Sequence, residues 1–391
     1  MESNLVQNLV NLKSLPETWA VKDFKEVVSD NSGGNKKLAK SNFLKEGDIA
    51  VVDQGKKLIA GFYNDTSLAV KTQPPYVVFG DHTRVFKYID FPFIMGADGT
   101  KVLQPKKDNC ETKYLYYFFL SINVPNTGYN RHFKYLKNLK IPLPPLEQQK
   151  KIAAILDEAD AYRQKTKALI EKYDELTQSL FLDMFGDPVT NPMEWECKKF
   201  ENFTTKYNQG VNTTTEKIKY EDDGTFPIIR AGEVGKGSLS FDSVVWVDHE
   251  NESRIKETCK PIKGDVLYAN IGANLGTACL VETNRAFGIA WNVFRIQLKE
   301  QVNRTFFVHQ LNSEWVKRVV WSKVKTATVP FISGKQIAEL NFINPPVYIQ
   351  SDFEKRVQAI EAQKAQTQAS LAQAEDLFNS LLQRAFKGEL V

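Results

Sequence analysis

The strongest constraint on the fold of this chain is an internal repeat. A double proline at Pro144-Pro145 returns as Pro345-Pro346, 201 positions later. At the same spacing, apolar residues match on both sides of the prolines: Leu136 with Ile337, Leu139 with Leu340, Leu180 with Leu381, and Phe185 with Phe386. This ungapped match predicts a duplicated structural unit whose two copies share one local structure.

The beginnings of the two copies also match each other. Pro16 to Trp19, followed by Phe24, corresponds to Pro192 to Trp195, followed by Phe200, 176 positions later. Because the offset has grown to 201 at the double prolines, the second copy is 25 residues longer than the first. Gly47-Asp48 and Gly264-Asp265 each precede an apolar run, and we interpret them as a further shared landmark.

Each copy ends in a long segment with the composition of an α-helix. Residues 146–185 and 347–386 contain neither Pro nor Gly, and prolines precede both segments. Apolar or small residues recur in steps of four and three, which is typical of a coiled-coil seam. They are Ile152, Leu156, Ala159, Ile170, Tyr173, Leu180 and Met184 in the first segment, and Phe353, Val357, Ile360, Leu371, Ala374, Phe378 and Leu381 in the second.

The length of these segments decides how they pack. About forty helical residues extend roughly 60 Å at 1.5 Å per residue, which is longer than a domain of about 140 residues is wide. The alternative is two amphipathic helices that pack separately, each on its own domain. We therefore predict an α+β fold in which two mixed α/β domains are joined by two long helices, packed as an antiparallel coiled coil with pseudo-two-fold symmetry. The predicted boundaries are 1–143 and 188–345 for the globular domains, and 144–187 and 346–391 for the long helices.

Composition and charge indicate the class of protein. The chain is 42% hydrophobic and 25% charged, which is ordinary for a globular protein, and it has no apolar run long enough to span a membrane. The first residues lack the features of a signal peptide, so we expect a cytoplasmic location and no membrane partner. The four cysteines form no C-x-x-C pair, which argues against a zinc ribbon and a disulfide framework.

The charge is distributed in blocks that follow the repeat. The net charge is only +4, but it is +6 over residues 1–143, −3 over 144–187, +2 over 188–343 and −1 over 344–391. Two basic globular domains separated by acidic helices are compatible with phosphate binding in two places. Unequal charge between domains is also common without any nucleic-acid partner.

Loops in both predicted domains carry small, basic and amide residues. Arg and Lys can pair with guanine, Asn with adenine, and glycine lets the backbone approach a phosphate. Any one of these loops could be an ordinary solvated turn, and His82 and His132 could be satisfied polar residues beneath a loop. As a set they predict DNA-contacting residues, namely Lys56, Lys57, His82, Arg84, Lys101, Tyr129, Arg131, His132, Arg230, Lys236, Asn270, Asn274, Lys323 and Lys325.

Signals for catalysis are weak. Asn344 to Tyr348 and Gln73 to Tyr76 are similar to the (Asn/Asp)-Pro-Pro-(Tyr/Phe) loop of amino-methyltransferases, which holds a flipped base. The first has an extra Val and the second lacks the Asn or Asp. No glycine-rich fingerprint for a nucleotide, no phosphate-binding loop and no metal-ligand cluster is found. We therefore expect no catalytic residues, no metal and no cofactor in this chain.

Several segments resemble the specificity subunits of type I restriction-modification systems, the HsdS family. Ile141 to Leu156, which leads into the long segment ending in Asp183 to Asp187, resembles the central region of the family. Val329 to Ile337 and Leu382 to Leu390 are similar to its second half. The second copy reads Asn344-Pro-Pro-Val-Tyr-Ile-Gln350 where the first has Leu-Pro-Pro-Leu-Glu-Gln-Gln149, a departure that weakens helix capping there.

The resemblance implies a non-catalytic subunit that gives a methyltransferase/endonuclease complex its DNA sequence specificity. Residues 1–143 and 188–345 would be target-recognition domains, each reading half of a bipartite double-stranded DNA site, and the helices would set the gap. Two methyltransferase subunits would supply S-adenosylmethionine, and restriction subunits would supply ATP and Mg²⁺ chemistry. Two alternatives stay open: a stand-alone adenine-N6 DNA methyltransferase using Asn344 and Tyr348, and a coiled-coil scaffold without a DNA role.

Overall fold

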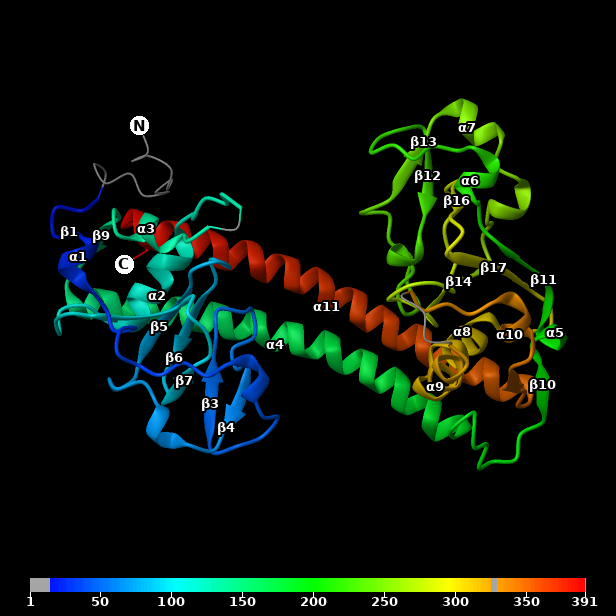
Figure 1. Ribbon diagram of the computed structural model, residues 1–391, viewed down its shortest axis with the longest axis horizontal. Coiled ribbons are helices and arrows are strands. Elements are labelled where there is room, and N and C mark those ends of the chain that lie inside the picture. Colours follow the sequence, from blue (N-terminus) through cyan, green and yellow to red (C-terminus); the bar gives the residue numbers. More distant parts are fainter. Residues whose placement is uncertain (1–14, 129, 325–328, 391) are drawn as a thin grey trace. The chain divides into compact units, whose positions relative to one another are not determined.

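The chain divides into two compact units. The computed structural model describes residues 15–128, 130–324 and 329–390. Unit 1 consists of Met1–Ala168 and Thr367–Val391, and unit 2 consists of Leu169–Gln366. Two long helices, α4 (Leu146–Phe185) and α11 (Val347–Lys387), each begin in one unit and end in the other (Figure 1).

Unit 1 combines two small sheets with short helices. Its elements are β1 (Ala20–Asp23), α1 (Phe24–Val27), β2 (Val28–Asp30), β3 (Ile49–Val52), β4 (Gly61–Tyr63), β5 (Tyr76–Gly80), β6 (Phe86–Ile89), β7 (Phe93–Met95), β8 (Thr100–Pro105), α2 (Thr112–Ser121), α3 (Phe133–Leu136) and β9 (Lys140–Leu143). One sheet has the order β2-β8-β5-β6 and the other β4-β3-β7, and β1 pairs with β9.

Unit 2 repeats this topology and adds short helices. Its elements are β10 (Cys197–Lys199), α5 (Phe200–Phe203), β11 (Thr204–Gln209), α6 (Thr213–Glu216), β12 (Phe226–Ile229), β13 (Val245–Val247), α7 (His249–Ser253), β14 (Val266–Ala269), β15 (Ala278–Leu280), β16 (Gly288–Ile289), β17 (Val293–Leu298), α8 (Arg304–Asn312), α9 (Glu314–Ser322), α10 (Gly334–Ala338) and β18 (Asn341–Ile343). The strand orders are β11-β17-β14-β15 and β13-β12-β16, with β10 beside β18. In each unit the middle strand of the three-stranded sheet has one antiparallel and one parallel neighbour.

Strand β5 shows how the two sheets of a unit share one core. Successive side chains of a strand point to opposite faces of its sheet. Val77 and Phe79 pack in the cluster that includes α2, whereas Tyr76 and Val78 pack in the cluster that includes β3 and β7. The four-stranded sheet is therefore covered on both faces, which explains why β5 is apolar at every position before Gly80. Strand β14 alternates in the same way between the two clusters of unit 2.

One landmark of the repeat is confirmed and another is wrong. Phe24 and Phe200 begin the matching helices α1 and α5, and the two apolar runs that follow the Gly-Asp pairs form strands β3 and β14. Gly47-Asp48 precedes β3, whereas Gly264-Asp265 precedes β14. By strand order β14 corresponds to β5 and not to β3, so these two turns are not equivalent.

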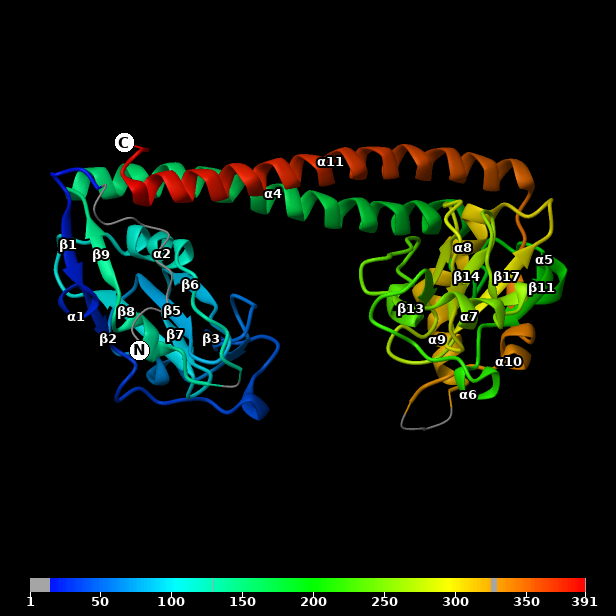
Figure 2. The same cartoon turned by 90° about the horizontal axis from the view of Figure 1, so that it is seen from above.

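Within each unit, one half of α4 packs antiparallel against one half of α11 (Figure 2). In unit 1, Lys167 pairs with Glu375 at 3.0 Å, and Arg163, one turn earlier, stacks over Phe378 at 4.2 Å. In unit 2, Asp174 pairs with Lys364, and Phe181 meets Phe353 with ring centroids 5.7 Å apart. The predicted packing of the two long helices on each other is therefore confirmed, and polar contacts interrupt their apolar seam.

The last turns of both long helices carry a buried phenylalanine. Phe386 of α11 packs on Tyr114 and Phe118 of α2 in unit 1. Phe185 of α4 packs on Phe306 of α8 in unit 2. Each unit therefore builds part of its core from the end of a helix that begins in the other unit.

Among the described residues, no helix is both long enough and apolar enough to cross a bilayer.

Candidate nucleic-acid interface

Four loops of unit 1 come together at one end of its sheets. Asp81 lies at their centre: its N–H donates to the Gly99 carbonyl at 2.7 Å, and its carbonyl accepts from the His132 N–H at 3.0 Å. The Thr83 hydroxyl donates to the Gln54 carbonyl. We call residues 53–57, 80–84, 96–101 and 130–132 the loop face of unit 1.

Unit 2 has the same construction around Asn270. Its N–H donates to the Asn292 carbonyl at 3.2 Å, and its carbonyl accepts from the Ile332 N–H at 3.0 Å. The Asn274 amide donates to the Ala231 carbonyl at 2.9 Å. We call residues 230–236, 270–276, 290–293 and 329–332 the loop face of unit 2.

The two loop faces therefore share one backbone hydrogen-bond frame, with Asp81 and Asn270 in equivalent places. Both side chains are buried, at 3% and 2% exposure. The Asp81 carboxylate accepts from the Phe133 N–H at 2.7 Å, so it satisfies the start of α3. The Asn270 amide donates to the Ile332 carbonyl at 3.4 Å, and its oxygen has no partner within the described part of the chain.

Some of the DNA-contacting residues predicted in unit 1 are exposed cations, and the others are held by contacts within the protein. Lys56, Lys57 and Arg131 are exposed on the loop face. Lys101 is half-buried, 3.8 Å from Asp30 and over the Phe133 ring.

Arg84, His82 and His132 are held by the loops themselves. Arg84 has a left-handed backbone at φ 63°, and its guanidinium donates to the Val124 carbonyl at 3.2 Å. The His82 ring contacts the Asn130 carbonyl at 3.1 Å. His132 is fully buried, with its ring against the Asp81 carbonyl at 2.9 Å, and takes the place that Ile332 takes in unit 2. His132 and Asn270 thus brace the loop faces and cannot touch a duplex without a rearrangement.

Two of the predicted cations of unit 2, Arg230 and Lys236, are paired with acids. Arg230 lies 3.5 Å from the buried Glu233 and also donates to the Ser243 carbonyl at 3.0 Å. Lys236 pairs with Glu314 at 3.0 Å. Lys323 is half-buried after α9. The predicted residues Tyr129 and Lys325 lie outside the described residues.

Exposed aromatic side chains on the loop face of unit 2 were missed by the sequence analysis. Trp291 is 46% exposed and Phe331 is 45% exposed. Residues 290–292 connect β16 to β17, as residues 96–99 connect β7 to β8 in unit 1. Lys101 at the start of β8 was predicted in the first copy, and the turn before the corresponding strand β17 contains Trp291.

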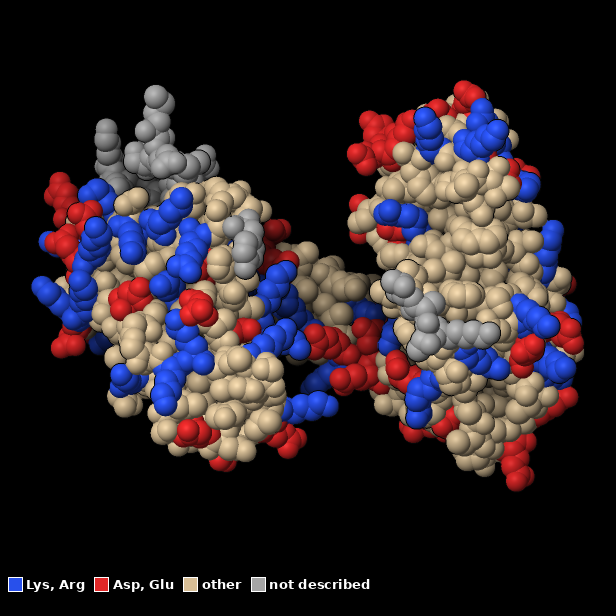
Figure 3. Space-filling model, viewed as in Figure 1, with Lys and Arg blue, Asp and Glu red and all other residues tan. Residues whose placement is uncertain are grey.

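The charge on the described surface is mixed. In Figure 3, Lys and Arg side chains are spread over the visible face of unit 1, with Asp and Glu side chains between them. Among the described residues, no group of three or more His, Cys, Asp or Glu side chains is arranged to hold a metal ion.

In the two segments similar to a methyltransferase loop, Asn344 and Tyr76 have roles in holding the fold together. Asn344 joins β18 to α11, and its N–H donates to the Glu196 carbonyl at 2.7 Å. Tyr348 is 74% exposed on the first turn of α11, whereas Tyr76 is fully buried. The buried Tyr76 ring cannot stack on a base without a rearrangement.

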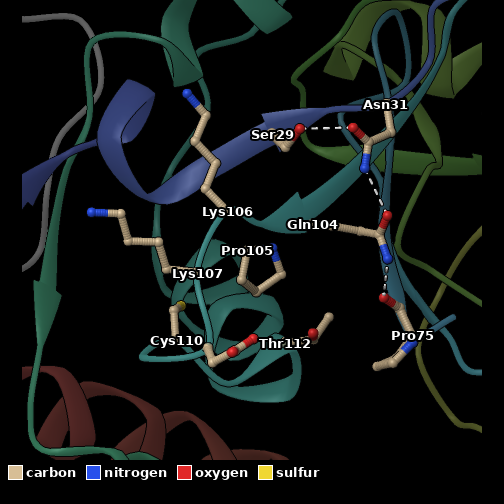
Figure 4. A pocket seen from close by; sticks show the side chains of 10 residues that line it. Ser29, Asn31, Pro75, Gln104, Pro105, Lys106, Lys107, Cys110 and Thr112 are labelled. Carbon is tan, nitrogen blue, oxygen red and sulfur yellow. Dashed lines mark hydrogen bonds between the residues drawn. The ribbon is translucent and has the colours of Figure 1, made fainter. Parts of the chain in front are cut away.

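A pocket of about 390 Å³ lies at the other end of the unit 1 sheet, beside the end of β8 (Figure 4). Its polar groups satisfy one another: the Ser29 hydroxyl donates to Asn31 at 2.7 Å, and Asn31 donates to Gln104 at 2.7 Å. Burial raises the pKa of the Cys110 thiol in its wall to about 12, so this thiol is not poised as a nucleophile. The pocket therefore offers no chemistry that would compete with the loop faces.

Comparisons with known proteins point to one family. Residues 16–173 match the model of the type I restriction modification DNA specificity domain. The chain is 24% identical over 310 residues to the type I restriction enzyme MjaIX specificity subunit of Methanocaldococcus jannaschii, covering 73% of this chain and 70% of that protein. It is 23% identical over 428 residues to the EcoBI specificity subunit of Escherichia coli, covering 98% and 89%.

Two solved structures have a similar fold. The S subunit of a type I restriction-modification system from M. genitalium has a TM-score of 0.53 at 15% identity, covering 94% of this chain and 96% of that chain. A chain from a study of complex assembly and conformational transition in a type I R-M system has a TM-score of 0.54 at 17% identity, covering 96% and 99%.

Proposed function

Because the chain belongs to the family of type I restriction-modification specificity subunits, we propose that each of its loop faces reads one half of a bipartite DNA site. Family members are the non-catalytic subunits that give these enzymes their sequence specificity, so no reaction is assigned to this chain. The observation that carries the proposal is the loop face itself, which recurs in both units on one hydrogen-bond frame. Loops held by a rigid scaffold are the usual place for recognition residues.

In this proposal, residues 1–143 and 188–345 are the two target-recognition domains, and 144–187 and 346–391 form the spacer. The duplicated sequence and the common strand order support an arrangement with pseudo-two-fold symmetry. Two half-sites one helical turn apart, about 34–36 Å, need a stiff connection between their readers. Two helices of 40 and 41 residues packed as an antiparallel coiled coil would supply it.

The proposed partners are double-stranded DNA and two methyltransferase subunits, with restriction subunits where the system cleaves DNA. S-adenosylmethionine, ATP and Mg²⁺ would be bound by those partners. The half-buried and exposed faces of α4 and α11 would dock the methyltransferases. A genomic DNA target implies that the complex works in the cytoplasm.

The test is methylation mapping with the full chain and its methyltransferase partner. We expect modified adenines within one bipartite, asymmetric sequence. Deleting one seven-residue helical repeat from both long helices should change the gap and leave both half-sites unchanged, because the helices set spacing and the loops set sequence. Changed half-site bases in that variant would contradict the division of roles.

The two alternatives have separate outcomes. S-adenosylmethionine binding and adenine methylation by the purified chain alone would favour a stand-alone methyltransferase. A complex that protects no DNA sequence in footprinting would favour a scaffold.

A further inference from the structure

Two exposed aromatic side chains flank the centre of the unit 2 loop face. Trp291 precedes Asn292, whose carbonyl accepts the Asn270 N–H, and Phe331 precedes Ile332, whose N–H donates to the Asn270 carbonyl. Trp291 is 46% exposed and Phe331 is 45% exposed. Large apolar side chains on a surface indicate a binding site when they stand together on a functional face.

Both rings stand on backbone that is fixed by hydrogen bonds. The Trp291 carbonyl accepts from the Gln209 amide at 2.6 Å, and the Asn292 side chain accepts the Ala231 N–H at 3.2 Å. Next to Phe331, the Pro330 carbonyl accepts the Gly272 N–H at 2.9 Å. Little conformational entropy would therefore be lost when these rings meet a ligand.

The equivalent positions in unit 1 are charged. Asp98 precedes Gly99 where Trp291 precedes Asn292, and Arg131 precedes His132 where Phe331 precedes Ile332. The Asp98 side chain is 80% exposed and pairs with Lys37, and Arg131 is exposed. The backbone hydrogen bonds are thus the same in both units, but the exposed side chains at these positions are charged in unit 1 and aromatic in unit 2.

We propose that Trp291 and Phe331 are specificity-determining residues, through which unit 2 reads its half-site by apolar contact with the bases of double-stranded DNA. This inference rests on the proposed function and deepens it. DNA is the occupant that fits, because the equivalent loop face of unit 1 carries the exposed cations Lys56, Lys57 and Arg131, which complement a phosphate backbone. Apolar side chains such as Phe can pack on the thymine methyl group in the major groove, and such contacts carry sequence information that phosphate contacts lack.

Apolar base contacts and phosphate contacts differ in how they respond to salt. Apolar base contacts release no counterions, so removing them should weaken binding without changing how affinity varies with salt. A lost phosphate contact would instead weaken binding on all sequences and lower the slope of log affinity against log salt.

The experiment uses the full chain in complex with its methyltransferase partner and a duplex that carries the mapped site. Trp291→Ala and Phe331→Ala should each reduce affinity for that duplex by about tenfold, relax the base preference of one half-site only, and leave the salt slope unchanged. Trp291→Phe should retain most of the affinity. Ile262→Ala is the control, since Ile262 is 61% exposed but precedes β14, at the end of that strand away from Asn270.

Two results would overturn the inference. One is wild-type affinity and half-site preference in both alanine variants; the other is an equal loss of affinity on unrelated sequences. Hydrogen exchange of β14 and β17 in the variants shows that the unit remains folded. The wild-type complex alone tests the proposed function: if it shows no sequence preference, the proposed function is wrong, whatever the variants show.

Discussion

The two loop faces share the same backbone hydrogen bonds but expose different side chains. Asp81 and Asn270 make the same pair of backbone hydrogen bonds to the loops on either side of them. The loop face of unit 1 presents exposed lysines and Arg131, whereas that of unit 2 presents Trp291 and Phe331 and pairs its cations with acids. The backbone hydrogen bonds of the loop face therefore do not dictate which side chains it exposes. A duplicated fold can in this way carry two different recognition chemistries.

The largest losses of stability should come from substitutions at the ends of the long helices, where the two units are most alike. Phe386→Ala and Phe185→Ala should each cost about 3–5 kcal/mol, since both rings are buried among other aromatic residues. The loss should stay within one unit: unit 1 for Phe386, and unit 2 for Phe185. Hydrogen exchange of α2 and α8 measures each unit separately, which matters because a two-unit chain need not unfold in one step.

The control for this pair is Leu377→Ala, on the same helix as Phe386 but 53% exposed. It should change the protection of α2 little. Equal loss of protection in both units after either phenylalanine substitution would mean that the units unfold together.

The next largest effect is a difference between the two units in how their stability depends on pH. His309 on α8 occupies the place of Tyr117 on α2, counting from the N-caps Asn303 and Glu111. Burial lowers the pKa of His309 to about 4, whereas a histidine in an unfolded chain titrates near 6.5. The unfolded state therefore binds the proton first as the pH falls.

This group should make unit 2 acid-sensitive. Its free energy of unfolding should fall by about 2–3 kcal/mol between pH 6.5 and pH 4, with no contribution from His309 above that window. His309→Leu should flatten this part of the pH profile of α8 protection, corrected for the intrinsic exchange rate. His249, whose ring is 93% exposed on α7, provides the control His249→Leu. An unchanged slope in the His309 variant would refute the assignment.

A smaller difference is expected at the centre of the two frames. Asp81→Ala removes a buried acceptor of the Phe133 N–H and should cost unit 1 about 1–3 kcal/mol. Asn270→Ala removes one long hydrogen bond together with an oxygen that has no described partner, so unit 2 should lose less than about 1 kcal/mol. Exchange rates of the loop faces would report both, and a larger loss in unit 2 would reverse the comparison.

Elements with local signals could be predicted from sequence. The long helices follow from a run without Pro or Gly and from a regular apolar spacing, and β5 and β14 follow from short apolar runs. Strands β7 and β16 have three and two residues, and they exist because β3 and β12 pair with them from far along the chain. The Gly-Asp landmark failed for the same reason, since strand identity depends on pairing partners.

The candidate site was predictable at the level of loops but not of side chains. Except for the turn at Lys323, which follows α9, the described loops that the sequence analysis selected contribute to the two loop faces, because small, basic and amide residues mark turns at strand ends. Whether a side chain is free depends on tertiary neighbours: His132 is buried under Asp81, and Arg230 is paired with Glu233. Trp291 was missed because a tryptophan beside an apolar strand looks like a core residue.

The smallest effect tests whether the charge difference between the loop faces is functional. Lys56 and Lys57 are exposed and form no ion pair within the described residues, whereas Lys236 is held by Glu314. Replacing Lys56 and Lys57 together by Ala should lower the slope of log affinity against log salt by at most about 2, because each phosphate contact contributes about 0.9. Lys236→Ala should change the slope less, since its charge is already partly neutralised by an acid. Titrations of the complex on the mapped duplex between low and moderate salt measure both slopes, with Glu314→Gln as the reciprocal variant. A larger change for Lys236 than for the lysine pair would mean that unit 2, and not unit 1, holds the phosphate backbone.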